Sequence, residues 1–185
     1  MIYDLIKKRR AVFPVQYNDR PISDNDIQTI LESANWAPTH KRTEPWRFKV
    51  VKEKAKTRLS EFMSEAYLKY TPDPKKLKVK KIKEKVHQSA AIIAICMQRD
   101  PEERLPEWEE IAATAMAVQN MWLVCTEMGI GCYWSSPSFI KYMDGFFHLK
   151  GGERCLGFLY MGYFDGPLEE GHRGSYSNKV SWMID

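Results

Sequence analysis

Basic side chains occur at places in the sequence where they could bind an anion. Arg9 and Arg10 are adjacent near the N-terminus, and two guanidinium groups offer paired donors that match a phosphate. His, Lys and Arg follow one another at residues 40–42, and residues 133–137 (YWSSP) combine a tryptophan with two hydroxyl groups. Together these residue types suit a planar aromatic anion as the bound ligand.

The segment at residues 35–51, NWAPTHKRTEPWRFKVV, has an unusual composition for a loop. Its prolines and small polar residues predict a loop, and its end alternates as a strand does. It also contains Trp36, Trp46, a histidine and four basic residues. Such a loop is either fixed by packing or shaped to hold a ligand. Trp46 and Phe48 are expected in the core rather than at a cofactor.

Several common catalytic patterns are absent from the sequence. It has neither G-x-x-x-x-G-K-[ST] nor a G-x-G-x-x-G that follows a strand, and it has no G-x-S-x-G. The four histidines are scattered, so a hydrolase built on one of them has no support. The cysteines form no C-x-x-C pair and have no histidine at the spacing of zinc ligands. No metal site is therefore expected.

Composition places the chain among globular proteins. Its 185 residues are 44% hydrophobic and 28% charged, so residues 1–185 are expected to form a single domain. The net charge of +4 is small for a protein whose basic face binds nucleic acid. No apolar run reaches the ~20 residues of a membrane-spanning helix. The well-separated cysteines indicate reduced thiols, and a cytoplasmic location is expected.

Hydrophobic periodicity predicts both helices and strands. The helices are expected at residues 1–10, 23–37, 56–70, 75–85 and 105–129, and the strands at 47–53, 89–98, 129–137 and 153–164. Ser23, with Asp26 three residues later, is typical of a helix N-terminus, and Pro106 suits the first position of the longest helix. The tail that follows the last strand is polar and glycine-rich, with Trp182 and Met183 as anchors.

The lysine-rich segment at residues 75–85 has two interpretations. Val79, Ile82 and Val86 recur at helical spacing, which favours an amphipathic helix with a solvated lysine face. The alternative is a patch that binds DNA or RNA in a salt-dependent way. The helical interpretation is favoured, so no nucleic-acid partner is expected.

Four segments of the chain carry a family resemblance. They are LIKKRRAVFPVQYNDRPI, APTHKRTEPWRF, AATAMAVQNMWLVCTEMGIGCYW and LGFLYMGY. The first resembles the opening helix and loop of the FMN-dependent nitroreductase family, and the second its A-P-[ST]-x-x-x-x-[QE]-P-W-x-F loop. The third is similar to the family's central helix and the turn after it, and the fourth to its last core strand. The resemblance covers the full length and points to the small, single-domain bacterial members.

The resemblance implies an α+β fold, with a mixed, mainly antiparallel sheet wrapped by helices in an intertwined homodimer. It implies FMN at the dimer interface and two-electron transfer from NAD(P)H to a flat electron-poor acceptor such as a nitroaromatic, quinone or enone. Flavin N5 would carry this ping-pong chemistry, so no catalytic side chain is expected. Residues 112–124 also favour a dimer, because a helix this apolar has more apolar surface than one domain of this size can bury.

The resemblance also implies roles for residues at the N-terminal side of the FMN site. Arg9 and Arg10 match arginines that contact the phosphate, the ribityl chain and the pyrimidine edge of the flavin. Ala11 stands where the family usually has serine, so one hydroxyl contact is missing. Trp36 and His40 match positions that reach the flavin held by the other subunit.

The remaining implied contacts lie later in the chain. Trp134, Ser135 and Ser136 match a segment that lines the far side of the flavin. Close relatives have arginine at the position of Trp36, so a phosphate contact has to come from elsewhere, with Lys179 or Arg173 as the candidates.

Each of these residues has a simpler alternative. The two arginines could end a helix, the two serines could end a strand, and Trp36 could be dimer packing alone. The function also has alternatives: a flavin-binding carrier or sensor without reductase turnover, or another flavin reaction on the same fold. The sequence does not decide between NADH and NADPH.

Overall fold

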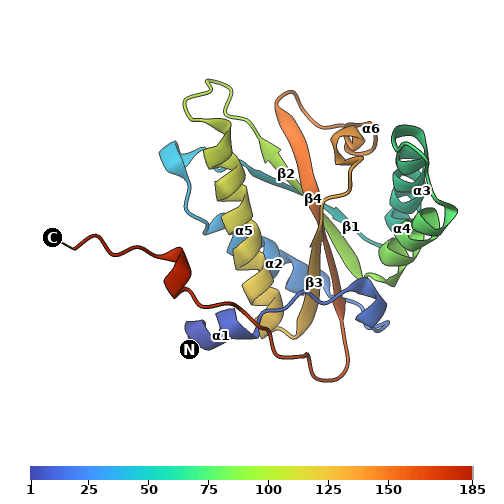
Figure 1. Ribbon diagram of the computed structural model, residues 1–185. Coiled ribbons are helices and arrows are strands. Elements are labelled where there is room, and N and C mark those ends of the chain that lie inside the picture. Colours follow the sequence, from blue (N-terminus) through green and yellow to red (C-terminus); the bar gives the residue numbers. More distant parts are fainter. Residues whose placement is uncertain (185) are drawn as a thin grey trace.

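The computed structural model describes residues 1–184, and a four-stranded sheet lies at its centre (Figure 1). Asp185, the last residue of the expected domain, lies outside the described residues. The strands are β1 (Trp46–Val51), β2 (Ala91–Gln98), β3 (Ile130–Ser135) and β4 (Glu153–Tyr163). The helices are α1 (Ile2–Lys8), α2 (Asp24–Asn35), α3 (Glu53–Tyr70), α4 (Lys76–Gln88), α5 (Glu107–Glu127) and α6 (Asp144–Phe147).

The sheet has the strand order β1-β2-β4-β3, and every pair of neighbouring strands is antiparallel. An isolated parallel bridge joins Ala11 to Cys132 of β3. This arrangement confirms the expected α+β class with a mainly antiparallel sheet.

Strand β2 explains why helices cover both faces of the sheet. Its side chains alternate between the faces, as those of any strand do. Ile93 and its neighbours two residues away pack with α2 and α5, whereas Ile92 packs with α3 and α4. Both isoleucines are fully buried, so the strand reads as a continuous apolar run. Figure 1 shows α5 and α2 at one side of the sheet and α3 and α4 at the other.

Most of the expected elements are present, with small shifts at their ends. Ser23 caps α2, because its Oγ accepts a hydrogen bond from the backbone N–H of Asp26 at 3.0 Å. Pro106 precedes α5 as its N-cap instead of taking the first helical position. Trp46 lies in the core, as expected. Within residues 1–184, none of the helices has the length and apolar character needed to cross a membrane.

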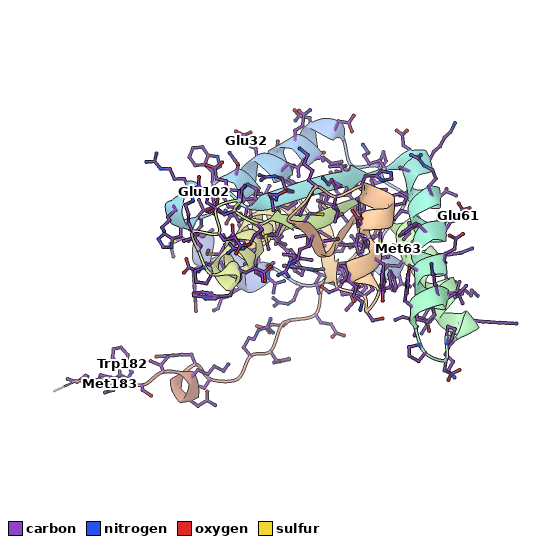
Figure 2. The ribbon with its side chains drawn as sticks, turned by 90° about the horizontal axis from the view of Figure 1, so that it is seen from above. Glu32, Glu61, Met63, Glu102, Trp182 and Met183 are labelled. Carbon is purple, nitrogen blue, oxygen red and sulfur yellow. The ribbon has the colours of Figure 1, made fainter. Side chains whose placement is uncertain are left out.

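The expectation that Trp182 and Met183 anchor the tail is wrong, because neither side chain packs against the rest of its own chain. Their exposed fractions are 77% and 91%, and the tail extends away from the rest of the chain (Figure 2). The sequence pattern cannot reveal this, because an apolar residue in a tail has no periodicity that would indicate its partner.

Burial of β2 on both faces makes a testable prediction about stability. Ile92→Ala and Ile93→Ala should each lower the free energy of unfolding by about 3 kcal/mol, because each leaves a cavity in a packed core. Val50→Ala should cost less than about 1 kcal/mol, since Val50 pairs with Ile93 but is 42% exposed. Urea unfolding monitored by circular dichroism measures all three variants. A nearly neutral result for either isoleucine would contradict burial of that face.

Candidate functional site

Helix α5 holds the two N-terminal arginines in place. Arg9 ends α1, and its guanidinium carbon lies 4.7 Å from the centre of the Trp122 ring on α5. The indole N–H of Trp122 donates a hydrogen bond to the carbonyl oxygen of Arg10 at 3.1 Å. A guanidinium over an aromatic face is a favourable contact, so one tryptophan positions both arginines.

Arg10 connects α1 to the C-terminal strap, the name used here for residues 169–173. Its Nε donates to the carbonyl oxygen of Glu169 at 3.2 Å, and its Nη1 donates to the carbonyl oxygens of Lys7 and Arg9. A Cβ at Gly171 would lie 2.5 Å from the guanidinium carbon of Arg10. The strap can pass this close to Arg10 because glycine has no side chain there.

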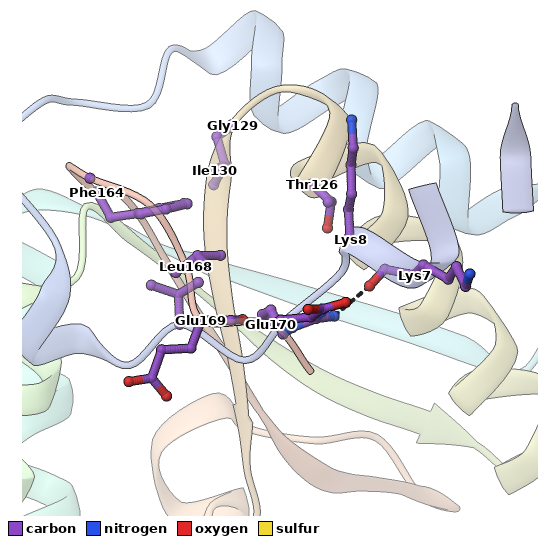
Figure 3. A pocket seen from close by; sticks show the side chains of 12 residues that line it. Lys7, Lys8, Thr126, Gly129, Ile130, Phe164, Leu168, Glu169 and Glu170 are labelled. Atoms are coloured by element: carbon purple, nitrogen blue, oxygen red, sulfur yellow. Dashed lines mark hydrogen bonds between the residues drawn. The ribbon is translucent and has the colours of Figure 1, made fainter. Parts of the chain in front are cut away.

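Two neighbouring cavities open around Arg10. The first, of about 550 Å³, lies between the start of the strap and the end of α5, and Figure 3 shows Lys7, Lys8, Glu169 and Glu170 around it. The second, of about 580 Å³, has three guanidinium groups among its lining residues. Its lining comprises Ile6, Lys7, Arg9, Arg10, Gln119, Glu170, Gly171 and Arg173.

The three arginines of the second cavity repel one another. Burial lowers the pKa of Arg9, and the nearby charges of Arg173 and Arg10 lower it further. No salt bridge within residues 1–184 pairs any of the three with a carboxylate. Such a cluster is suited to an anion, which would offset both the burial and the repulsion.

The structure places His40 far from the arginines of the same chain and leaves Trp36 on the surface. His40 lies in a 3-10 turn (His40–Arg42), and its Nδ1 is 2.7 Å from Glu109 Oε2 near the start of α5. Trp122 lies thirteen residues further along that helix, which corresponds to about 20 Å at 1.5 Å per residue. Trp36 follows α2 and is 81% exposed. His40 therefore needs a second chain to reach the site at Arg9.

Trp134, Ser135 and Ser136 lie at the end of β3, and only the two serines line a common cavity. Trp134 packs with the α2 and α5 side of the sheet, and its buried Nε1 has no hydrogen-bond partner within residues 1–184. Ser135 points to the other side, where its Oγ is 3.4 Å from Lys85 Nζ. Ser136 Oγ donates to the carbonyl oxygen of Leu156 at 2.9 Å. Alternation along the strand separates Trp134 from Ser135.

The two tail candidates for an anion contact occupy different places. Arg173 lines the second cavity beside Arg9 and Arg10. Lys179 ends a 3-10 turn (Ser177–Lys179) farther along the tail, in the part that extends away from the sheet (Figure 1). In this chain, Arg173 is therefore the residue that completes the cluster. Ala11 contributes a backbone bridge to Cys132 and no polar side chain.

Reasoning from the sequence missed a second basic cavity. Lys78, Lys81 and Lys85 of α4 line a space of about 310 Å³ at the end of β3, on the sheet face opposite to α5. Their spacing places them on one helix face together with buried Ile82, and that spacing was the available signal. Residues 1–184 contain no cluster of three or more His, Cys, Asp or Glu side chains that could hold a metal.

Comparisons with known proteins agree on one family. A family model described as the nitroreductase family matches residues 6–163. The chain is 30% identical to a Bacillus subtilis protein named "Putative NAD(P)H nitroreductase YfhC", over 99% of this chain and 94% of that protein.

Solved structures show the same relationship. A nitroreductase-like family protein from Bacillus cereus is 28% identical, with a TM-score of 0.86 over 99% of this chain and 96% of its own. The fold is also shared with a Bacteroides fragilis nitroreductase with bound FMN, which is 18% identical with a TM-score of 0.71 over 99% of this chain and 98% of its own. This chain belongs to the nitroreductase family.

Proposed function

We propose that this protein is an FMN-dependent oxidoreductase that transfers two electrons from NAD(P)H to a flat, electron-poor acceptor such as a nitroaromatic, quinone or enone. One observation carries the proposal: Arg9, Arg10 and Arg173 line one cavity, and no salt bridge within residues 1–184 pairs any of them with a carboxylate. Family membership and the FMN in the Bacteroides fragilis relative support the identity of the anion.

The donors that remain free fit the phosphate of FMN. Within residues 1–184, the side chain of Arg9 makes no hydrogen bond, and that of Arg173 donates only to the carbonyl oxygen of His172. These two guanidinium groups would hold the phosphate, whereas Arg10 mainly holds the strap in position. Lys179 and the segment Trp134–Ser136 remain proposed contacts that a second chain or a moved tail would complete.

The bound FMN would supply the hydride and electron transfer, and the protein would supply position and electrostatics. Arg9 and Arg173 would fix the phosphate end, and Trp122 would keep Arg9 from turning away. The positive charge of Arg10 would favour negative charge on a nearby ligand. None of these residues has to act as a nucleophile. In ping-pong transfer, the electron donor and the acceptor would occupy one binding slot in turn.

The absorption spectrum of the freshly purified protein tests this function first. An oxidised-flavin spectrum that bleaches anaerobically with NADH or NADPH is expected, and the faster donor identifies the coenzyme preference. Flavin that stays oxidised with both donors would point to a carrier or sensor. A colourless protein that also fails to bind added FMN would overturn the proposal.

Loss of Arg173 should weaken FMN binding. Removing one charge-assisted contact to a phosphate is expected to raise the FMN dissociation constant of Arg173→Gln about tenfold or more. Fluorescence quenching of FMN during titration of the apoprotein measures this constant. Arg58→Gln is the matched control, because Arg58 is an exposed arginine of α3 and does not line the cavity. Equal affinities of the two variants would remove Arg173 from the site.

A second copy of the chain is the proposed partner. Ala112, Ala115, Met116, Gln119 and Leu123 recur along one face of α5, and none of them is buried in the single chain. Gln119 also lines the arginine cavity, so this face adjoins the proposed FMN site. A homodimer would cover the face and bring Trp36 and His40 of one chain toward the arginines of the other.

A charge in the middle of this face should break the dimer. Met116→Glu is expected to shift the mass measured by light scattering after gel filtration from that of a dimer to that of a monomer, because the carboxylate would lose its hydration. Leu68→Glu on α3 is the control, since it changes a similarly exposed apolar residue outside this face. A dimeric Met116→Glu protein would place the interface elsewhere.

A further inference from the structure

The positive charge of this chain is concentrated on one helix. Residues 71–88, which comprise α4 and the turn before it, contain seven lysines and two acidic residues. The whole chain has 28 lysines and arginines and 24 acidic residues, which leaves 21 and 22 of them outside this segment. The segment therefore has an excess of five positive charges, whereas the rest of the chain has an excess of one negative charge.

Three of these lysines form the outer face of α4, the name used here for Lys76, Lys80 and Lys83. They follow one another at helical spacing, and all three are exposed. They line a surface groove of about 670 Å³. This groove shares no lining residue with the two arginine cavities or with the cavity at the end of β3, so it is a separate surface.

Few carboxylates neutralise the outer face. The one salt bridge that involves it within residues 1–184 joins Lys80 to Glu84, with the two atoms 3.7 Å apart and both side chains exposed. An exposed pair of this kind is weak. Asp19 also lines the groove, but no salt bridge within the described residues joins it to a lysine. Lys76 and Lys83 are therefore available to an anion from outside the chain.

Apolar and aromatic side chains are exposed beside the outer face, at the hairpin tip, the name used here for residues 68–77. Leu77 belongs to the first turn of α4 and is 63% exposed. Tyr70 ends α3; its ring stacks on that of Tyr142 with the centres 3.4 Å apart, and the ammonium of Lys69 lies 5.1 Å from its centre. Lysine, leucine and tyrosine side chains are typical of a protein surface that meets lipid headgroups.

The composition of this surface fits lipid headgroups better than a nucleic acid. Residues 71–88 contain no arginine, the residue that makes paired contacts with phosphate and with guanine. Lysine carries a point charge on a flexible stem, which suits a surface whose phosphates are mobile. Leu77 would reach the hydrocarbon beneath lipid headgroups, whereas the phosphate backbone of a duplex offers it no apolar partner.

The position of α4 in the fold leaves the outer face free. Ile82 and Val86 bury the inner side of the helix in the core cluster that contains Ile92 of β2. Helices α3 and α4 lie on the side of the sheet opposite to α5 (Figure 1). The proposed dimer uses α5, so it would not cover the outer face.

We propose that the outer face and the hairpin tip form a docking surface for an anionic lipid bilayer. The lysines would meet the negative headgroups, and Leu77 would enter the boundary between headgroups and hydrocarbon. The helix would lie along the membrane surface without crossing it. This docking goes beyond the proposed oxidoreductase function and does not depend on a bound flavin.

Sedimentation of the full chain with lipid vesicles tests the docking. Vesicles of phosphatidylcholine with about a third of phosphatidylglycerol should bind the protein, and vesicles of phosphatidylcholine alone should bind it at least about tenfold more weakly. Raising the salt concentration from about 0.1 M to about 0.5 M should release the protein, because salt screens exposed charges.

Removal of the outer lysines should abolish most of this affinity. The combined changes Lys76→Gln, Lys80→Gln and Lys83→Gln are expected to weaken binding to the anionic vesicles about 100-fold, since each lysine near such a surface contributes about fivefold.

The matched control removes the same charge elsewhere. Lys54, Arg58 and Lys150 are exposed and line none of the cavities described above. Their combined change to glutamine should weaken vesicle binding less than about threefold, because these charges lie outside the docking surface. Circular dichroism and flavin content should match the wild type in both triple variants, since neither changes a residue of the arginine cavities.

Leu77→Gln separates a lipid surface from any other polyanion. The variant keeps every lysine, and it should weaken vesicle binding about fivefold through the lost apolar contact. Its binding to a DNA duplex of random sequence should equal that of the wild type.

Four outcomes would overturn the proposal. They are no binding to anionic vesicles, equal binding to both kinds of vesicle, equal losses in the two triple variants, and tighter binding of the duplex than of the vesicles with no effect of Leu77→Gln on either. The last outcome would make the outer face a nucleic-acid site. None of the four would affect the oxidoreductase function, which the flavin spectrum tests separately.

Discussion

The contact between Trp122 and the two N-terminal arginines fixes the position of the positive charges of Arg9 and Arg10. The indole ring lies beneath Arg9, and its N–H fixes the backbone of Arg10. Trp122 belongs to α5, which packs along one side against the sheet and cannot shift without disturbing a dense core. The charged cluster, the short helix α1 and the strap therefore take their positions from the sheet through one side chain.

This dependence brings together charges that would otherwise separate. Arg9, Arg10 and Arg173 come from opposite ends of the sequence, and their repulsion opposes the folded arrangement. An anion that binds only the folded chain stabilises it in proportion to its concentration and affinity. An anion in the arginine-lined cavity and an ordered strap therefore stabilise each other.

The sequence predicts features that depend on local pattern and misses those that depend on distant partners. The cap at Ser23, the buried run of β2 and the long helix α5 follow from short-range rules and are confirmed. Helical periodicity predicts a solvated lysine face that includes Lys85, because it does not show that the end of β3 lies beside this lysine. The roles of Trp36 and His40 could be proposed only from family resemblance, since no local pattern in the sequence indicates what these two side chains approach.

The hydrogen bond from Arg10 to Glu169 joins residues 159 positions apart, nearly the whole length of the chain. During synthesis the sheet and α5 can assemble while the ribosome is still adding residues, since domains fold as their segments emerge. The strap emerges after the sheet and α5, so a nascent chain has its core before its third arginine is in place. A cofactor that needs this arginine for tight binding would be retained only after the strap had left the ribosome and docked on Arg10. Binding of the cofactor would then be one of the last steps in the maturation of the site.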